Sequence, residues 1–600
     1  MFSGSSYPST SPASWSRETS FLQQAVAKGQ TSLPGYSGTE DREGNEERGR
    51  GGKRRSFGFR SSVSVDSRLS PTEEDSEDED DTITLPATSR GESGSSMPPN
   101  RLANETTPLI ATSSPPADSP FSADAAAVRA ASRLDDDARD AYASEAKTLL
   151  GYTVPILGTH FLEFSLTAST VLFLGHLGET ELAAASLGNM TNNFLALSVI
   201  VGFCSALDTL CPQAFTSPQP KMTSTYAIRT WLITVVLLIP QAVLFWFSEY
   251  ILRDMLHQDP AVALLAARYL KVLIPALPAY AGFEVLRRWL QAQGLMSAPV
   301  LALTVAAPIN LLLNYVLVWG PIDSLRFGFL GAPLSATISV NIMFIVLFAY
   351  AVLRAPRDAW GGVGPEVFKA RDLWLNFKLG LAGVGMVGSE WWSWEIVSLA
   401  TSFLGPTSLA AQSVLLTSAS FFYQFQYALS VAAAVRIGNL LGAQKPHLAR
   451  VASRVVIVAA TIISAVNSVT LVLLRNVWGR IFSSDKEIIV LVAAVLPLVA
   501  AFQLWDGLSG AMGGVLRGAG KPALGSIINL ASYYVIGIPL GLFLTFTGPH
   551  LGLNGLWLGL TAALTISGVS STYLVYQMDW EAESETTRRR LGTAKRDEED

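Results

Sequence analysis

The sequence predicts an all-α integral membrane protein, with twelve transmembrane helices in two six-helix lobes related by a parallel internal repeat. Three observations support this fold class. Apolar residues make up 49% of the 600 residues, and the charged residues gather in the two ends and the loops. Twelve apolar stretches have about the 20 residues that are needed to cross the hydrocarbon core of a bilayer. The segment LGETELAAAS at 177–186 returns as LGPTSLAAQS at 404–413, with seven of ten residues identical.

The first 146 residues have the composition of a disordered cytosolic tail. Ser, Pro, Gly and charged residues dominate, and such a segment cannot bury enough apolar surface to fold. Within this tail, Glu105, Leu109 and Ile110 form the pattern ExxxLI, which resembles an acidic dileucine signal that directs membrane proteins to vacuoles or lysosomes. The alternative is a chance match in a long polar tail.

The predicted N-lobe, at 147–354, contains the first six apolar stretches, at about 149–174, 183–210, 225–247, 261–282, 296–319 and 330–353. A charged, Gly-rich cytosolic linker at 355–372 follows. The predicted C-lobe, at 373–577, contains the other six stretches, at about 374–403, 408–435, 451–473, 487–511, 523–546 and 552–576. A second cytosolic tail occupies 578–600. Because each lobe has an even number of spans, both lobes take the same orientation, as in transporters built from parallel repeats.

The distribution of Lys and Arg predicts the orientation in the membrane. If the amino terminus is cytosolic, twenty basic residues lie near the cytosolic ends of the spans and five near the opposite ends. The twenty include Arg287, Arg288 and Arg517. Short basic loops stay in the cytosol, so both termini are expected there.

Several kinds of site are not indicated by the sequence. Cys204 and Cys211 are separated by about 10 Å of helix rise, which is too far for a disulfide. The five histidines show no metal-ligand spacing, and no GxxxxGK[ST] loop is present to bind a nucleotide. We therefore expect no metal and no cofactor, and an ion gradient as the energy source of uphill transport.

Five acids lie within the apolar stretches: Glu163, Asp208, Glu390, Glu395 and Asp506. An acid buried in hydrocarbon is costly and is a functional candidate by default. The step from 163 to 390 is 227 residues, the same as the step from 177 to 404 between the repeated segments. A poorly hydrated cavity disfavours an ionised carboxylate, so protonation near neutral pH is expected to be accessible.

Asp208 has a structural alternative. It lies one residue from the repeat mate of Arg436, so the two side chains are candidates for an ion pair across the lobe interface.

An aromatic wall is predicted beside Glu390. Trp394 lies four residues after Glu390, on the same helix face, whereas Glu395 points about 140° away and is expected to face different surroundings. A carboxylate beside an indole suits an organic cation, since the ring face adds a cation–π contact of about 0.5–2 kcal/mol. Trp391 and Tyr423 are further candidates for the wall of this cavity. The alternative is that the aromatic residues only pack or face lipid.

From 147 to 577 the residues resemble the multidrug and toxin extrusion (MATE) transporters, in particular their eukaryotic, fungal-like branch. The matching motifs are LGHLGETELAAASLGN, ALDTLCPQAF, SEWWSWE, VRIGNLLGA, GGVLRGAGK and GLWLGL. The resemblance implies an exchanger of organic cations and other amphipathic compounds against protons, with Glu390 and Asp506 as the proton-linked pair and Glu395 as the second acid of the helix motif. Thr170 stands where bacterial and archaeal members carry an acid, and Glu163, about two turns earlier, is a candidate replacement.

Two alternatives of the same superfamily stay open, a sodium-coupled exchanger and a flippase for lipids or lipid-linked sugars. A membrane enzyme is not expected, because no clustered His and Asp residues are visible at a membrane face. We expect a monomer whose partners are small organic cations, protons and the lipid bilayer, with no nucleic acid. The sorting pattern favours the vacuolar membrane over the plasma membrane.

Overall fold

The computed structural model describes residues 120–596 except 176, 321–322 and 484. This part of the chain is helical throughout, with no strand, as the sequence predicts. From Ala126 to the end of the described residues it belongs to one compact unit. Glu105, Leu109 and Ile110, the sorting pattern, lie outside the described residues.

The first half of the helical part runs from α2 to α11. Its main elements are α2 (Pro120–Gly175), α3 (Glu179–Asn192), the π-helical turn η1 (Asn193–Leu197), α4 (Ser198–Cys204), α5 (Ala206–Phe215), α6 (Met222–Trp246), α7 (Ser248–Tyr250), η2 (Ile251–Met255), α8 (Pro260–Leu273), α9 (Ala276–Ala292), α10 (Ala298–Asn314), η3 (Tyr315–Trp319) and α11 (Gly331–Arg354). The start of α8 follows the usual signals: Asp259 caps the amides of Ala261 and Val262, and Pro260 takes the first helical position.

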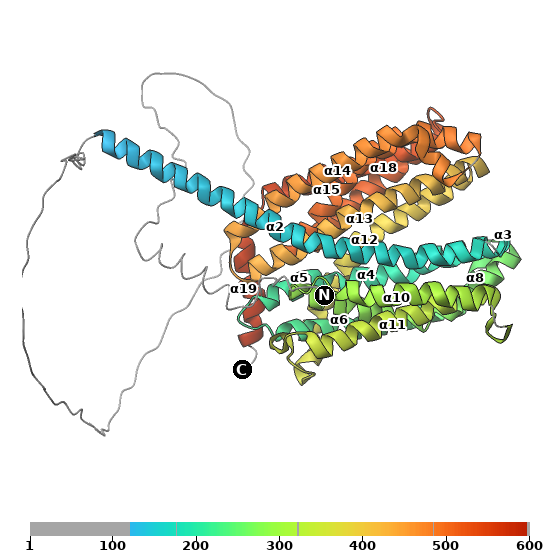
Figure 1. Ribbon diagram of the computed structural model, residues 1–600, viewed down its shortest axis with the longest axis horizontal. Helices are drawn as coiled ribbons and strands as arrows, with labels where there is room; N and C mark the ends of the chain where they lie inside the picture. Colours follow the sequence, from blue (N-terminus) through green and yellow to red (C-terminus); the bar gives the residue numbers. More distant parts are fainter. Residues whose placement is uncertain (1–119, 176, 321–322, 484, 597–600) are drawn as a thin grey trace, which may run out of the picture. The chain divides into compact units, whose positions relative to one another are not determined.

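The second half follows two short 3-10 turns, η6 (Arg357–Ala359) and η7 (Pro365–Phe368). Its elements are α12 (Ala370–Ser402), α13 (Pro406–Gly442), α14 (Pro446–Phe482), α15 (Lys486–Gly518), α16 (Pro522–Leu530), η8 (Ala531–Gly537), α17 (Ile538–Leu542), η9 (Phe543–Thr547), α18 (Leu553–Tyr576) and α19 (Trp580–Arg596). Figure 1 shows α13, α14, α15 and α18 on one side of the molecule and α4, α6, α10 and α11 on the other.

Each of the twelve predicted stretches falls on a helix or on a run of broken helices. Within the described residues, nine helices are long and apolar enough to cross a membrane, and a tenth span results if α8 and α9, bent by 53°, are counted together. The two long helices outside that set are α12, with 33 residues, and α13, with 37. Both carry polar residues of the cavities described below, which lowers their hydropathy.

The first long helix begins earlier than the sequence analysis expects. The predicted N-lobe starts at 147, whereas α2 starts at Pro120. The stretch 124–146 contains nine Ala and three Arg residues, which favour helix. The end of the polar tail therefore forms a helix, and this helix runs on without a break into the first membrane span.

The residues after the last span also form a helix, α19, which packs against the rest of the molecule. Trp580 is buried, and Gln444 donates a hydrogen bond to the Ser584 carbonyl at 3.2 Å. Arg590 donates to the Gln213 side chain of α5 at 2.6 Å, and burial lowers the pKa of Arg590. The helix thus attaches to α13 in the second half and reaches α5 in the first (Figure 1).

The two halves touch at one end of the molecule, which we call the closed end. There the hydroxyl of Thr216, directly after α5, donates to the Asn439 carbonyl of α13 at 2.7 Å, and the side-chain amide of Gln213 donates to the Gly518 carbonyl at 2.9 Å. Gly442 of α13 lies so close to α5 that a Cβ there would stand 2.2 Å from the Gln213 carbonyl oxygen. Glycine is therefore needed for this close approach.

Candidate functional site

A cavity of about 300 Å³ lies between the two halves. From the first half, Glu163 of α2 and Arg287 of α9 line it. From the second half, Glu390 of α12, Asp506 of α15 and Arg517 of α15 line it. The cavity therefore brings together charged groups of both signs from four helices.

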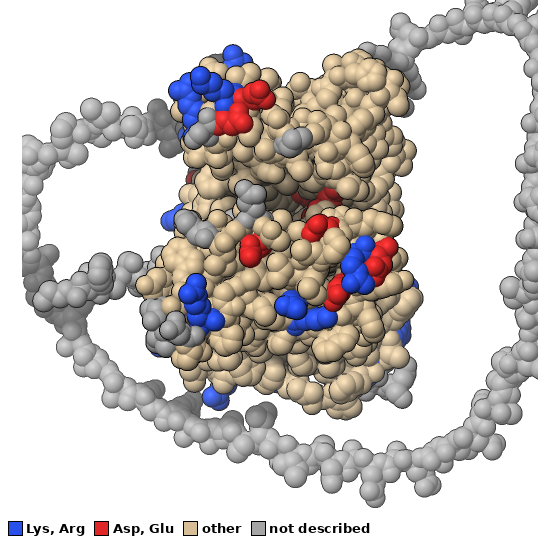
Figure 2. Space-filling model, turned by 90° about the vertical axis from the view of Figure 1, so that its right-hand side faces the viewer, with Lys and Arg blue, Asp and Glu red and all other residues tan. Residues whose placement is uncertain are grey.

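A second cavity, of about 230 Å³, adjoins the first and is lined in part by the same side chains. The shared residues are Glu390, Trp391, Ser420, Tyr423 and Asp506. Figure 2 views the end of the molecule opposite the closed end; this face is hollowed between its two halves, with acidic side chains at the hollow. We call this end the open end.

Glu390 and Asp506 both line both cavities. Asp506 is 5% exposed and Glu390 is half-buried. The Tyr423 ring lines the same two cavities as the Glu390 carboxylate. Within the described residues, neither acid is in an ion pair with Lys or Arg at 4.0 Å or less. A small cation in the first cavity can therefore approach these two carboxylates, whereas Glu163 in the same cavity is paired with Arg287.

The predicted aromatic wall lies at the same place. Trp391 and Tyr423 line both cavities, and Trp394 lines the second. Trp394 is held edge-on against Phe502, with ring centroids 5.3 Å apart, and against Trp557, with centroids 5.6 Å apart. Such packing fixes the indole plane at the cavity surface.

Glu395 lies in the second cavity but does not line the first. The sequence analysis expects Glu395 and Glu390 to face different surroundings, because five residues turn a helix by about 140°. In the structure they share one cavity, because the second cavity is wide enough to reach both faces of α12.

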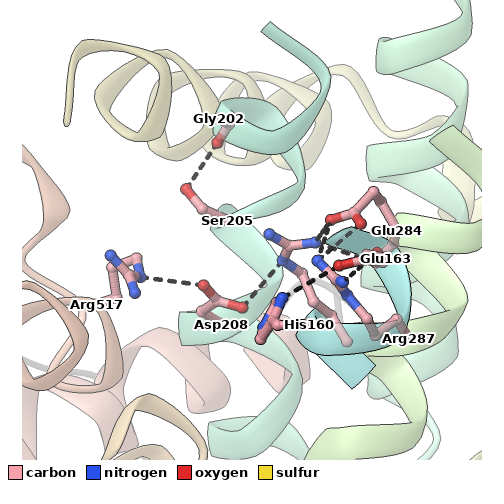
Figure 3. Close-up of polar contacts among 9 residues, drawn as sticks. His160, Glu163, Gly202, Ser205, Asp208, Glu284, Arg287 and Arg517 are labelled. Carbon is pink, nitrogen blue, oxygen red and sulfur yellow. Dashed lines mark hydrogen bonds and ion pairs between the residues drawn. The ribbon is translucent and has the colours of Figure 1, made fainter. Parts of the chain in front are cut away.

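Glu163 also faces the first cavity, but it is already bound to a cation. Arg287 Nη1 donates to its carboxylate at 3.0 Å, and His160 Nδ1 lies 3.1 Å away (Figure 3). His160 in turn packs against Tyr427 of the second half, with ring centroids 4.7 Å apart. Glu390, the repeat mate of Glu163, has no such arginine among the described contacts. The equivalent acids of the two halves therefore have different surroundings.

The predicted Asp208–Arg436 pair is wrong. The Asp208 carboxylate accepts from Arg288 Nε at 3.1 Å and pairs with Arg517 Nε at 3.1 Å, whereas Arg436 binds Glu145 at 2.6 and 2.7 Å. Residues at matching positions of the repeat occupy equivalent places, each in its own half. Matching positions therefore need not be in contact. Asp208 faces α9 and α15, and Arg436 faces the early part of α2.

Sequence reasoning also missed a buried network of charged residues, Glu284, Arg287, Arg288, Asp208 and Arg517. Glu284 is fully buried and binds Arg287 at 2.7 Å (Figure 3). It also binds Arg288. The sequence analysis counts Arg287 and Arg288 among the basic residues near the cytosolic ends of the spans, and the structure shows both buried in α9. The signal that could have identified them is the sequence EVLRR, in which an acid lies three and four residues before two arginines.

The arrangement suits reversible binding of a cation. Two carboxylates provide negative charge, and the tryptophan and tyrosine rings provide flat apolar surfaces with a favourable electrostatic face. No group of three or more His, Cys, Asp and Glu side chains suited to a metal ion occurs within the part of the chain that the structure describes.

Comparisons with known proteins agree with this architecture. The MatE family model matches residues 155–316 and 384–543. The chain is 38% identical over 455 residues to the uncharacterized transporter C4B3.13 of Schizosaccharomyces pombe, covering 76% of this chain and 83% of that protein. It is 34% identical over 450 residues to multidrug and toxin extrusion protein 2 of Mus musculus, covering 75% and 77%.

A solved structure extends the match to the fold. The crystal structure of the eukaryotic MATE transporter AtDTX14 superimposes with a TM-score of 0.71 at 28% identity, over 75% of this chain and all of that one. The family members are transporters and not enzymes. The membrane helices, the family model and these relatives together show that the chain belongs to the MATE family of multidrug and toxin extrusion transporters.

Proposed function

We propose that the protein is a secondary active antiporter that exports organic cations and amphipathic toxic compounds in exchange for protons by alternating access. The observation that supports this most is the placement of Glu390 and Asp506, which line both cavities beside Trp391 and Tyr423. A multidrug and toxin extrusion protein among the relatives supports the same class of substrate.

Coupling follows if a proton and a cation compete for the same two carboxylates. Ionised Glu390 and Asp506 attract a cation, and a proton that arrives from the more acidic side neutralises them and releases it. A substrate that bound equally well to both protonation states would give no coupling, because a ligand shifts an equilibrium only by its differential affinity.

The other acids have different proposed roles. Glu395 lines only the second cavity, so it adds negative charge on the way to the pair. Glu163 is held by Arg287 and His160, and we assign to it the placing of Arg287 in the first cavity in preference to proton transfer. Asp208 and Arg436 are structural in this account.

The proposed setting is the vacuolar membrane, with both termini in the cytosol and the closed end on the cytosolic side. The bias of Lys and Arg supports the orientation, and the pattern of Glu105, Leu109 and Ile110 supports the location. Microscopy of the tagged chain with Leu109→Ala and Ile110→Ala tests the location; unchanged vacuolar labelling would remove that support.

Transport by the purified protein in lipid vesicles tests the function. With an acidic lumen, and the sodium concentrations equal on both sides, we expect accumulation of tetraethylammonium that collapses when a protonophore is added. Accumulation that follows a sodium gradient at clamped pH would instead identify a sodium-coupled exchanger. Movement of a headgroup-labelled lipid without any response to pH would identify a flippase.

A further inference from the structure

We propose that the helix after the last span is a latch that stabilises the closed end in its closed state. The latch consists of residues 580–591 of α19. Its first turns are fixed to the second half, and its last residues, Arg590 and Leu591, contact the first half. The inference rests on the proposed function in one respect, alternating access, which requires the closed end to open in each transport cycle.

The first turns of α19 are anchored on the second half. Trp580 is 1% exposed. The Glu583 carboxylate pairs with Lys521, which follows α15. Ser584 makes two hydrogen bonds with the side chain of Gln444, which follows α13: its carbonyl accepts at 3.2 Å and its hydroxyl donates at 3.1 Å. A buried ring, an ion pair and two hydrogen bonds therefore hold this part of the latch in place.

The far end of the latch contacts the first half. Arg590 Nη1 donates to Gln213 Oε1 of α5 at 2.6 Å. Leu591 packs against the apolar core of the first half, whose buried members lie between Ala184 and Ala359. Ten residues of helix rise by about 15 Å, and over this length α19 passes from one half to the other, across the closed end (Figure 1).

The bond to Gln213 lies in the interface that must open. Gln213 Nε2 donates to the Gly518 carbonyl at 2.9 Å, while its Oε1 accepts from Arg590. Gly520 has a positive φ of 79°, and a Cβ there would lie 2.6 Å from Arg590 Nη1. The second half thus binds both ends of one amide group of the first half. The closed end cannot open here without separating Arg590 from Gln213.

The contacts at the far end suit a reversible latch. Opening breaks one hydrogen bond from a charged donor and exposes one leucine, which is a limited cost. Arg590 then reaches water at the end of the molecule, so its charge is not left buried without a partner. The latch therefore favours the closed state without preventing the opening that transport requires.

The alkylation rate of a cysteine in the interface measures how often the closed end opens. Thr209 suits this purpose, because it is fully buried and its hydroxyl donates to the Arg517 carbonyl of the other half. A buried thiol reacts only when its cover opens, so the rate follows the open population when closing is fast. The full chain with Thr209→Cys is treated with N-ethylmaleimide in lipid nanodiscs, at one pH and without added cation.

We expect Arg590→Gln to raise the alkylation rate at Thr209→Cys by about tenfold, a shift in the opening equilibrium of about 1.4 kcal/mol. Leu591→Ala, which weakens the other contact of the latch with the first half, should shift the rate in the same direction.

The matched control is Arg588→Gln, which changes an exposed arginine two residues earlier in the same helix. Arg588 pairs with Glu585 of α19 at 2.7 Å. We expect this variant to keep the rate of the parent chain. Equal rates for Arg590→Gln and Arg588→Gln would overturn the proposal.

The native cysteines separate opening of the closed end from unfolding. Cys204 and Cys211 are buried in the apolar core of the first half, and mass spectrometry resolves alkylation at each site. We expect their rates to stay unchanged in Arg590→Gln. A rise in proportion to the rate at Thr209→Cys would identify unfolding in place of a latch and would also count against the proposal.

A truncated chain that ends at Thr587 provides a second test, because it keeps Trp580 and Ser584 but lacks the far end of the latch. It should raise the rate at Thr209→Cys at least as much as Arg590→Gln does, and a rate equal to that of the parent would refute the latch. These rates need no transport. A failure of proton exchange in vesicles and a failure of the latch are therefore distinguishable.

Discussion

Replacing Glu390 with glutamine is expected to reduce proton-driven uptake of tetraethylammonium by at least about 30-fold, which corresponds to about 2 kcal/mol, the lower end of the cost of removing one partner of a buried charge pair. The amide has nearly the same shape as the carboxylate, but it carries no charge. The variant therefore loses both the attraction for a cation and the site for a proton. Initial uptake rates in vesicles with an acidic lumen provide the measurement.

Two glutamate variants serve as controls in the same vesicles. Glu249→Gln changes an acid in α7 that lines neither cavity, and uptake should match the parent chain. Glu395→Gln changes an acid of the second cavity alone and should reduce uptake less than Glu390→Gln does. Proton-driven exchange that survives intact in Glu390→Gln would remove this residue from the mechanism.

The second large effect is expected on stability, from Arg436→Gln. Arg436 makes two hydrogen bonds to the Glu145 carboxylate, at 2.6 and 2.7 Å, and Glu145 is 2% exposed. Removing the arginine leaves a buried carboxylate without its counter-charge, which costs about 3–5 kcal/mol. Thermal or denaturant-induced unfolding in detergent, followed by the loss of helical circular dichroism, should show this loss.

Two further variants separate charge burial from general damage. Arg454→Gln removes an exposed arginine that donates to Tyr142 at 3.2 Å, and its effect should stay within about 0.5 kcal/mol. Glu145→Gln combined with Arg436→Gln removes both charges, so it should recover part of the loss. Equal stability of Arg436→Gln and Arg454→Gln would show that the buried pair contributes little.

The sequence could predict the features that the membrane requires of each single helix. Hydrocarbon excludes charge, so the apolar stretches and the acids within them are visible without a structure, and Glu390, Asp506, Trp391 and Tyr423 all line the predicted cavity. The pairing of Glu390 with Asp506 came from the resemblance to the MATE family, whereas the helical period of 3.6 residues placed Trp394 on the same face of the helix as Glu390.

The features that sequence could not predict depend on which helices face each other. Arg287 and Arg517 contribute to the basic bias of the cytosolic ends, yet both are buried and paired across helices. Repeat symmetry suggested a contact between Asp208 and Arg436, whereas each side chain binds a residue far away in sequence. A polar terminal segment likewise gave no sign that Trp580 would be buried.

Counting the protons released when tetraethylammonium binds tests most directly whether a cation and a proton exclude each other at Glu390 and Asp506. The purified protein is titrated with tetraethylammonium in weakly buffered detergent solution that contains a pH indicator, and binding is measured in parallel. We expect proton release with binding by the parent chain, and none by the Glu390→Gln and Asp506→Asn double variant. Full binding by the parent chain without any proton release, at every pH at which the protein is stable, would contradict the account.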